Sequence, residues 1–464
     1  MGALITVLPV FFPILAGLCL LPVKFKERKQ REQWVLTIVV LNAIFALFAI
    51  WSGKADAFTL FHFSDKLSLE LRMDGLSKVF GTMVSVLWIL TTIYGFEYNF
   101  LTMYLFYEFL TLVTLPLVMH AMDNKARHAG KMYILYMMFG AALAFIGFVF
   151  VYCYGTSIDF VPGGVLNPIL VAGHEKTLQL VFIAAFFGFG VKAAVFPLYR
   201  WLPKASVAPT PVTALLHAVA VVKSGIFAII RLTYYSFGTD FLVGTVAQNV
   251  MLVAAAITIV FGSTVALRTP HIKRRFAYST VSNLSYIIFG IALMTPLGLA
   301  AALMHMIYHA VLKITLFFTA GAVLYKTHRE YLYEVEGFGR LMPVTFAAMT
   351  ITGIGLVGIP PFAGFHSKWA LATAAVQGGN PVSYLGILAL IISALLTALY
   401  VFYIVVRAYF PRNKEYPAGY YDHVQDPNWY MKGPLIILTV ASLVLAFTPG
   451  PLMEALQRVV MHLN

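Results

Sequence analysis

The sequence predicts an all-α fold, a polytopic bundle of transmembrane helices, and two observations carry this prediction. Hydrophobic residues make up 60% of the 464 residues and charged residues only 11%, whereas a soluble domain has about 25% charged residues. The apolar residues also come in blocks of about 20, the length at which a helix crosses a hydrocarbon layer roughly 30 Å thick. Composition therefore excludes an ordinary soluble enzyme or a disordered chain, and the unbroken blocks exclude a porin-type barrel, whose strands alternate.

Thirteen apolar blocks are long enough to span the bilayer. We expect them at 3–22, 34–52, 75–95, 99–120, 132–153, 178–198, 212–235, 243–266, 275–295, 298–325, 344–370, 383–410 and 434–449. No stretch between them is large or polar enough to form a soluble domain. The sequence thus predicts one integral membrane domain over 1–464, a multi-pass protein of the cell (inner) membrane with the lipid bilayer as its surroundings.

The net charge of +13 comes from 32 Lys and Arg against 19 Asp and Glu. We attribute it to cytoplasmic loops, where basic residues gather, and not to nucleic-acid binding, because no basic reading helix or aromatic-lined basic groove accompanies it. The basic segments are 23–33, 123–131, 268–275, 326–340 and 407–414. Three predicted spans separate the first two segments, which places them on opposite sides. Either one helix there is missing or partial, or one segment breaks the rule.

Eight ionisable side chains fall inside the apolar spans. A charge at the bilayer centre costs about 2.5–3.5 kcal/mol on insertion scales, so such residues persist when they face water or one another, and they typically mark ion or proton paths. These candidate path residues are Glu108, Lys192, His217, Lys223, His305, His309, Lys313 and Lys368.

Three of these residues form a polar stripe on one predicted helix. His305, His309 and Lys313 follow one another at intervals of four, so they span an arc of about 80° on a helix. A histidine pair with this spacing can ligate a metal, but no acid or cysteine joins it and a lysine follows, so we expect no metal. Imidazole exchanges protons near neutral pH, which favours a proton relay.

Two other lysines lie beside runs that break a helix. Lys192 precedes Pro197, and Lys368 follows the GIPPFAG run. Irregular backbone at membrane depth is tolerated where it lines a wet cavity, and transporters use such discontinuous helices in pairs. His217 and Lys223 are six residues apart, so they diverge by about 120° on a straight helix and line one path only if that helix is distorted.

Six motifs in order resemble the proton-translocating, antiporter-like membrane subunits, a family that includes complex I pumping subunits, Mrp-type cation/proton antiporter subunits and membrane-bound hydrogenase subunits. Within this family the lysine of GFHSK resembles that of the D-type Mrp antiporter subunit and its hydrogenase relatives. The motifs are MDGLSKVF (73–80), YEFLTL around Glu108, RWLPKASVAPTPVTALLHAVAVVKSGIF (200–227), HIKRRFAYSTVSNLSYI (271–287), LMHMIYHAVLKITLFFTAGAV (303–323) and GIPPFAGFHSK (358–368).

The resemblance implies roles for the residues of the first half. Glu108 is the glutamate that pairs with Lys192, the lysine of a broken helix. Lys223 is the bridging lysine, with His217 beside it. Only 34 positions separate Asp74 from Glu108, an interval in which family members fit one more helix. The first repeat (75–235) is therefore expected to lack one helix, which leaves thirteen spans in place of the family's fourteen.

For the second repeat (243–410), the resemblance implies that His305 and His309 lead to the central lysine, Lys313. Lys368 is then the terminal lysine of the second broken helix. In the family, two half-channels meet in a polar axis parallel to the membrane. The two broken helices suit a pair of inverted repeats.

The resemblance implies a subunit that moves protons, alone or in exchange for Na⁺, within a complex of membrane subunits. We expect no cofactor in this chain, because it has no glycine-rich nucleotide loop after a strand and no cysteine set for a cluster. The alternative is a pumping membrane-arm subunit of a complex I-like NADH:quinone oxidoreductase or a membrane-bound hydrogenase, with redox chemistry in partner subunits. A structural subunit with inactive channels is disfavoured because all eight path residues are present.

Overall fold

The computed structural model describes residues 2–20, 23, 28–52, 58–64, 67–71, 85, 99–412, 416, 419–422 and 424–461. The chain divides into two compact parts, residues 1–103 and 104–464, and each has its own architecture. Described residues are almost entirely helical, which confirms the all-α class. Eight described helices are long and apolar enough to cross a membrane, and the total of thirteen spans stays a prediction.

The described residues of the first part include two apolar helices and one hairpin. Helices α1 (Gly2–Leu20) and α2 (Arg28–Trp51) pack against each other, and strands β1 (Phe58–Ser64) and β2 (Leu67–Leu71) pair antiparallel. We did not predict the hairpin, although FTLFHFS is rich in phenylalanine, which favours strands. The predicted span 75–95 (Ser85 apart), the motif at 73–80 and residues 24–27 of the first basic segment lie outside the described residues.

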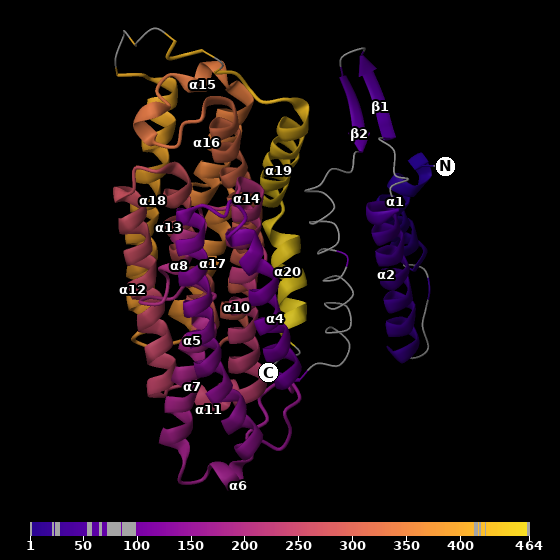
Figure 1. Cartoon of the computed structure of the whole chain (residues 1–464). Helices are drawn as coiled ribbons and strands as arrows, with labels where there is room; N and C mark the ends of the chain where they lie inside the picture. Colours follow the sequence, from indigo (N-terminus) through magenta and orange to yellow (C-terminus); the bar gives the residue numbers. More distant parts are fainter. Residues whose placement is uncertain are drawn as a thin grey trace. The chain divides into compact units, whose positions relative to one another are not determined.

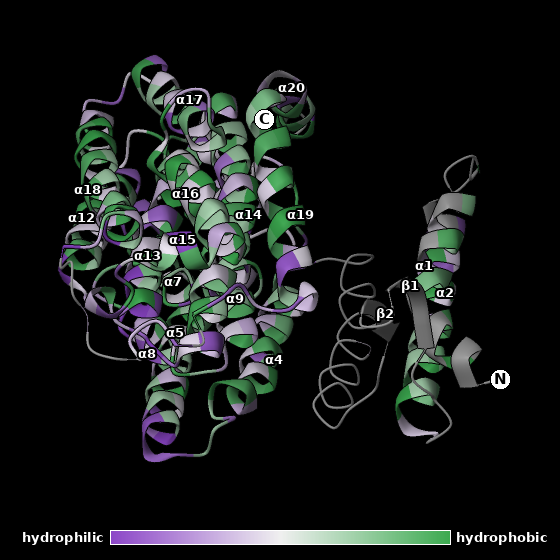
Figure 2. Cartoon of the chain, turned by 90° about the horizontal axis from the view of Figure 1, so that it is seen from above, coloured by the Kyte–Doolittle hydropathy of each residue, from purple (hydrophilic) through white to green (hydrophobic). Residues whose placement is uncertain are grey.

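The long helices of the second part run alongside one another (Figure 1), and hydrophobic residues cover most of α12 and α18 on its periphery (Figure 2). This distribution suits a bundle surrounded by lipid. The long helices are α4 (Phe100–Val118), α5 (Asn124–Tyr154), α12 (Val246–Arg268), α13 (Ile272–Ala292), α14 (Pro296–Thr327), α18 (Ser383–Tyr409) and α19 (Trp429–Phe447).

Shorter elements connect or interrupt these helices. They are α6 (Pro168–Val171), α7 (Glu175–Gly190), α8 (Trp201–Ala205), α9 (Thr210–Ala218), α10 (Val221–Arg231), the π-helical turn η1 (Leu232–Phe237), α11 (Thr239–Leu242), the 3₁₀ turn η2 (Leu332–Glu334), α15 (Phe338–Leu341), α16 (Pro343–Val357), α17 (Ala363–Gln377) and α20 (Pro449–Val460). Helix α20 was not predicted, because its 12 residues are too few to span the bilayer.

Among the predicted spans that the structure describes, three are discontinuous. The span at 178–198 stops as a helix at Gly190 and continues as turns until Trp201. The span at 344–370 consists of α16 and α17, separated at 358–362. The span at 212–235 breaks at 219–220, between His217 and Lys223, and ends in a π-helical turn. The helix that carries His217 and Lys223 is therefore distorted, as a shared path would require.

Two segments that we took for basic loops are largely helical. Helix α5 begins at Asn124, where the Asp123 carboxylate accepts a hydrogen bond from the Ala126 amide at 2.6 Å. Lys273 lies within α13 and is buried. The helical periodicity of these ends is masked in the sequence, because charged residues such as Lys273 and Arg275 occupy positions that the fold buries.

A residue from the polar stretch 411–433 fixes the start of the second broken helix. The Asp426 carboxylate accepts hydrogen bonds from the amides of Val344 (2.9 Å) and Thr345 (3.0 Å) and from the Thr345 hydroxyl (2.7 Å). The first amides of a helix lack partners within the helix, so a carboxylate there both satisfies them and complements the helix dipole. This contact anchors α16, whose other end lies at the break.

Candidate functional site

Helix α14 presents the predicted stripe to the interior of the second part. His305, His309 and Lys313 are all buried, with exposed fractions of 3%, 1% and 0%. Their neighbours come from α10, α13 and α17. Helix α14 therefore contacts the second halves of the broken spans 212–235 and 344–370, and also α13. A stripe of this kind on an otherwise apolar helix brings together groups that are far apart in sequence.

The stripe meets the bridging lysine at His309. The Lys223 ammonium nitrogen lies 2.8 Å from Nδ1 of His309, a hydrogen-bond distance. Helix α10, which carries Lys223, passes close to the first helix break, because a Cβ added at Gly225 would lie 2.6 Å from the Ala193 amide nitrogen and 2.9 Å from Cβ of Lys192. Only glycine permits this approach, so Lys223 is held between the first break and α14.

At its other end the stripe meets the second helix break. His305 Nδ1 lies 2.9 Å from the Ser367 hydroxyl, and the neighbouring Lys368 donates to the carbonyls of Leu356 (2.9 Å) and Val357 (2.7 Å). These carbonyls belong to the last turn of α16, whose C-terminal dipole favours a cation. The ammonium thus donates to two carbonyls that would accept hydrogen bonds from backbone amides if the helix continued.

The first break holds its lysine in a similar position, but the predicted pairing with Glu108 differs in detail. Lys192 lies two residues beyond the end of α7 and is fully buried. Its ammonium donates to the Tyr107 carbonyl and lies 3.3 Å from the centre of the Tyr107 ring. The Glu108 carboxylate is within Coulombic range, yet these two described residues make no ion pair within 4.0 Å.

His217 stands apart from Lys223, on the other side of the break at 219–220. Its Nε2 lies 3.3 Å from the Ser206 hydroxyl, and its ring lies 5.0 Å from that of Phe317 on α14. It is fully buried and within Coulombic range of Lys313. His217 therefore lies near the axis on the side of Lys313 and α14. The resemblance implied that His217 lies beside Lys223, but the two residues share only the break at 219–220 that connects their helices.

Lys313 uses partners from α13. Its ammonium donates to the Ser279 hydroxyl at 2.6 Å and to the Phe276 carbonyl at 3.2 Å. Within the described residues no group of three or more His, Cys, Asp or Glu side chains converges as metal ligands do. The two stripe histidines instead each bind a different partner, a hydroxyl and an ammonium.

Four partners of the path residues were not predicted from the sequence: Tyr107, Ser206, Ser279 and Ser367. The sequence offered a reason to expect two of these partners, because Tyr107 and Ser367 directly precede Glu108 and Lys368. It offered none for Ser206 and Ser279, since a hydroxyl in an apolar helix commonly bonds the carbonyl one turn back. Their roles depend on helices that meet only in the folded chain.

Four buried polar atoms along this line have no hydrogen-bond partner in the described chain: Oε1 of Glu108, Nδ1 of His217 and Nε2 of both His305 and His309. Buried polar groups in folded proteins are nearly always satisfied. Each of these atoms is therefore available to a proton, an ion or a bridging water. Together with the lysines, they form a polar axis through apolar helices.

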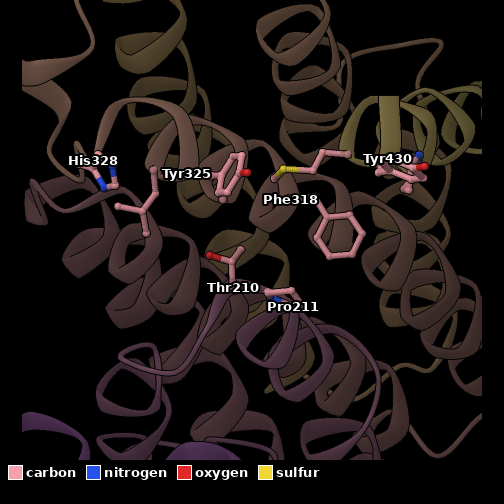
Figure 3. A pocket seen from close by; sticks show the side chains of 10 residues that line it. Thr210, Pro211, Phe318, Tyr325, His328 and Tyr430 are labelled. Atoms are coloured by element: carbon pink, nitrogen blue, oxygen red, sulfur yellow. The ribbon is translucent and has the colours of Figure 1, made fainter. Parts of the chain in front are cut away.

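A cavity of about 810 Å³ lies outside the axis (Figure 3). It lies between α9, α14 and α19, with Thr210, Phe318, Tyr325 and Tyr430 among its lining residues. None of the eight path residues lines it. An apolar cavity of this kind suits hydrocarbon better than an ion.

Comparisons with known proteins place the chain in a family. The family "NADH:quinone oxidoreductase/Mrp antiporter, TM" matches residues 98–397. The chain is 35% identical over 278 residues to NADH-quinone oxidoreductase subunit N of Desulforudis audaxviator (strain MP104C), covering 59% of this chain and 54% of that protein. It is 33% identical over 273 residues to NADH-quinone oxidoreductase subunit L of Mycobacterium tuberculosis (strain CDC 1551 / Oshkosh), covering 58% and 42%.

The chain therefore spans about half the length of the curated relatives it matches. A chain in the structure of the Mrp complex from Dietzia sp. DQ12-45-1b has the same fold, with a TM-score of 0.70, 20% identity, and coverage of 99% of this chain and 97% of that one. The family match covers well over half of the chain and includes both broken helices and all eight path residues. This chain is a membrane-embedded member of the NADH:quinone oxidoreductase/Mrp antiporter family.

Proposed function

We propose that the chain is an ion-translocating subunit that moves protons, alone or in exchange for Na⁺, along its buried axis. The observation that carries the proposal is the connected set of ionisable side chains, in which Lys223 contacts His309 and His305 reaches the second break through Ser367. Ionisable groups at membrane depth are costly to retain without such a role.

In this mechanism, charge changes on one group bias the next. A buried ammonium keeps its proton while a carbonyl, hydroxyl or carboxylate supports it, and it releases the proton when that support moves away. Lys192 and Lys368 lie at the two breaks, where backbone can move without disrupting a whole helix. Lys223 and the stripe on α14 connect these two positions.

Relatives point to partners of the same kind. One solved structure with this fold is that of an Mrp complex, and the two curated relatives are subunits of NADH-quinone oxidoreductases. We therefore propose that the chain works beside other membrane subunits in the cell membrane. We also propose two inverted repeats, at 75–235 and 243–410, and the presence of one lysine-bearing helix break in each supports this proposal.

The test is transport by the purified complex in lipid vesicles, followed with an internal pH dye, with and without a Na⁺ gradient. Lys223→Gln removes the ammonium that contacts His309 and should lower the rate by about 100-fold or more, as loss of a proton-transfer group does. Lys326→Gln, at the end of the same helix α14 that carries His309 and outside the axis, is the matched control and should leave the rate unchanged. Wild-type transport by Lys223→Gln would contradict the proposal.

The similarity to NADH-quinone oxidoreductase subunits N and L favours one alternative, a pumping subunit in the membrane arm of a redox complex. The same axis would then be driven by partner subunits. Purification of the intact complex distinguishes the two: NADH- or hydrogen-dependent reduction of an acceptor in the co-purified material supports the alternative, and gradient-driven exchange without redox activity supports the antiporter.

A further inference from the structure

A second buried polar feature lies beside the axis, between α13 and α18. Three hydroxyl residues of α13 and three of α18 face one another, and we call them the hydroxyl seam. They are Ser279, Ser282, Tyr286, Ser393, Thr397 and Tyr400, each with an exposed fraction of at most 1%. On α13 they are spaced three and four residues apart, and on α18 four and three, so each set occupies one helical face.

Direct hydrogen bonds connect the two faces. Ser279 and Tyr400 hydroxyls lie 2.5 Å apart, the Tyr286 hydroxyl donates to Ser393 at 2.6 Å, and Ser282 lies 3.1 Å from Ser393. The Thr397 hydroxyl, one turn along α18 from Ser393, donates to the Ser393 carbonyl at 2.6 Å. The step from Tyr400 to Ser393 therefore has no direct hydroxyl contact.

Both ends of the seam touch the axis. At one end the Lys313 ammonium donates to Ser279 at 2.6 Å. At the other end the Tyr286 ring lies 5.1 Å from the His305 ring, and the Lys368 ammonium lies 5.3 Å from the centre of the Tyr286 ring. The seam therefore runs parallel to the His305–His309 stripe and connects the same two regions, the central lysine and the second break.

We propose that the hydroxyl seam is a second proton route between Lys313 and Lys368, parallel to the histidine stripe. The inference rests on the proposed function, because it assigns a further route to that same ion path. It also explains why so many hydroxyls meet between two apolar helices. Aliphatic side chains at the same positions would pack without any need for hydrogen-bond partners.

The transfer balances as a hydrogen-bond relay. The Lys368 ammonium gives one proton, through a bridging water, to the Tyr286 oxygen; each hydroxyl accepts a proton on a lone pair and passes its own proton onward, from Tyr286 to Ser393 and finally from Ser279, and the neutral amine of Lys313 takes up the last one. Rotation of the hydroxyls restores their first orientation. Single bridging waters, or a side-chain rotation at Thr397, span the two gaps in the chain.

The competing explanation is that the hydroxyls only hold α13 and α18 together. Interhelical hydrogen bonds in membranes do stabilise packing. A second route and a packing contact differ in one measurable respect: parallel routes compensate for each other. Loss of one should then be mild until the other is also lost, whereas a packing contact gives the same effect in either background.

The experiment is a double-mutant cycle in the intact complex, measured as proton transport in vesicles. Tyr400→Phe interrupts the seam and keeps the ring, while His305→Ala interrupts the stripe. The two changes together should lower transport by about 5- to 150-fold more than the product of the single losses, the range of coupling between linked sites. The matched control is Ser285→Ala. Ser285 lies on the same helix as Ser279, and its buried hydroxyl has no hydrogen-bond partner among the described residues, so this change should cause no further loss of transport in the His305→Ala variant.

A structural role is separated by two further measurements. The thermal unfolding shift caused by Tyr400→Phe should be the same with and without His305→Ala, and Ser279→Thr, which keeps a hydroxyl, should transport better than Ser279→Ala in the His305→Ala background. Losses that simply multiply would overturn the seam as a route while leaving the proposed function intact. Absence of transport by the wild-type complex would overturn the proposed function itself.

Discussion

Replacement of Lys313 by arginine tests whether this residue must release a proton or only supply a charge. Arginine keeps the positive charge but is not deprotonated in proteins. Lys313 is fully buried and held by Ser279 and the Phe276 carbonyl. Both acceptors can bind a guanidinium, so the hydrogen bonds are preserved while deprotonation is prevented.

The expected magnitudes follow from this environment. A larger group in a closed site costs about 1–3 kcal/mol of stability through overpacking, so the variant should assemble with a lowered melting temperature. Transport should fall by about 100- to 10,000-fold, the usual contribution of a proton-transferring side chain. The control is Lys326→Arg, near the end of the same helix and half-exposed, for which transport and stability should both match those of the wild type.

The assay is proton movement into vesicles that contain the reconstituted complex, normalised to the amount of assembled protein. Lys313→Gln, measured in parallel, lacks both the charge and the exchangeable ammonium proton. If Lys313→Arg transports at the wild-type rate while Lys313→Gln does not, the ammonium acts only as a fixed charge. Deprotonation at this position would then have no part in the mechanism.

Three further predictions concern other parts of the chain. Glu108→Gln keeps the size of a side chain that has one buried, unpartnered oxygen, so it should reduce transport by at least about 10-fold while assembly stays normal; equal losses of both would refute a role in transport. A cysteine that replaces Lys125, in the exposed first turn of α5, should not react with a membrane-impermeant reagent added outside, because basic segments face the cytoplasm. The two exposed native cysteines are replaced beforehand, and labelling from outside would show that this end of α5 faces outward. Asp426→Asn should destabilise the complex by about 1–2 kcal/mol, because it weakens the contact that satisfies the first amides of α16, and an unchanged melting temperature would show that this contact is unimportant.

Some properties of this protein follow from residue type and spacing alone. The helical membrane fold and the burial of Lys192, Lys313 and the two stripe histidines agree with the prediction from the sequence. Blocks of about 20 apolar residues have few alternatives to a membrane helix, and an ionisable group within such a block is costly unless it faces the interior of the bundle. The breaks beside Lys192 and Lys368 were likewise visible as proline-containing runs.

The partners of these residues were decided by the tertiary structure. Helical periodicity shows which residues share a face but not which helix lies opposite, so the 2.8 Å contact between Lys223 and His309 could be expected only as a neighbourhood. The Lys192 ammonium binds the Tyr107 carbonyl and ring instead of forming a close ion pair with Glu108. A carbonyl is present at every residue, so no sequence pattern marks the one that a lysine will use.

The hydroxyl seam shows the same limit most clearly. Ser282 and Ser393 are 111 residues apart and hydrogen bond only because α13 and α18 pack together. In isolation each serine or threonine resembles the many that bond a carbonyl of their own helix. The sequence alone determined which helices form and which charges they must bury, because these depend on local hydrophobicity and spacing, whereas the pairing of polar groups depends on the positions of helices distant in the chain, which only packing defines.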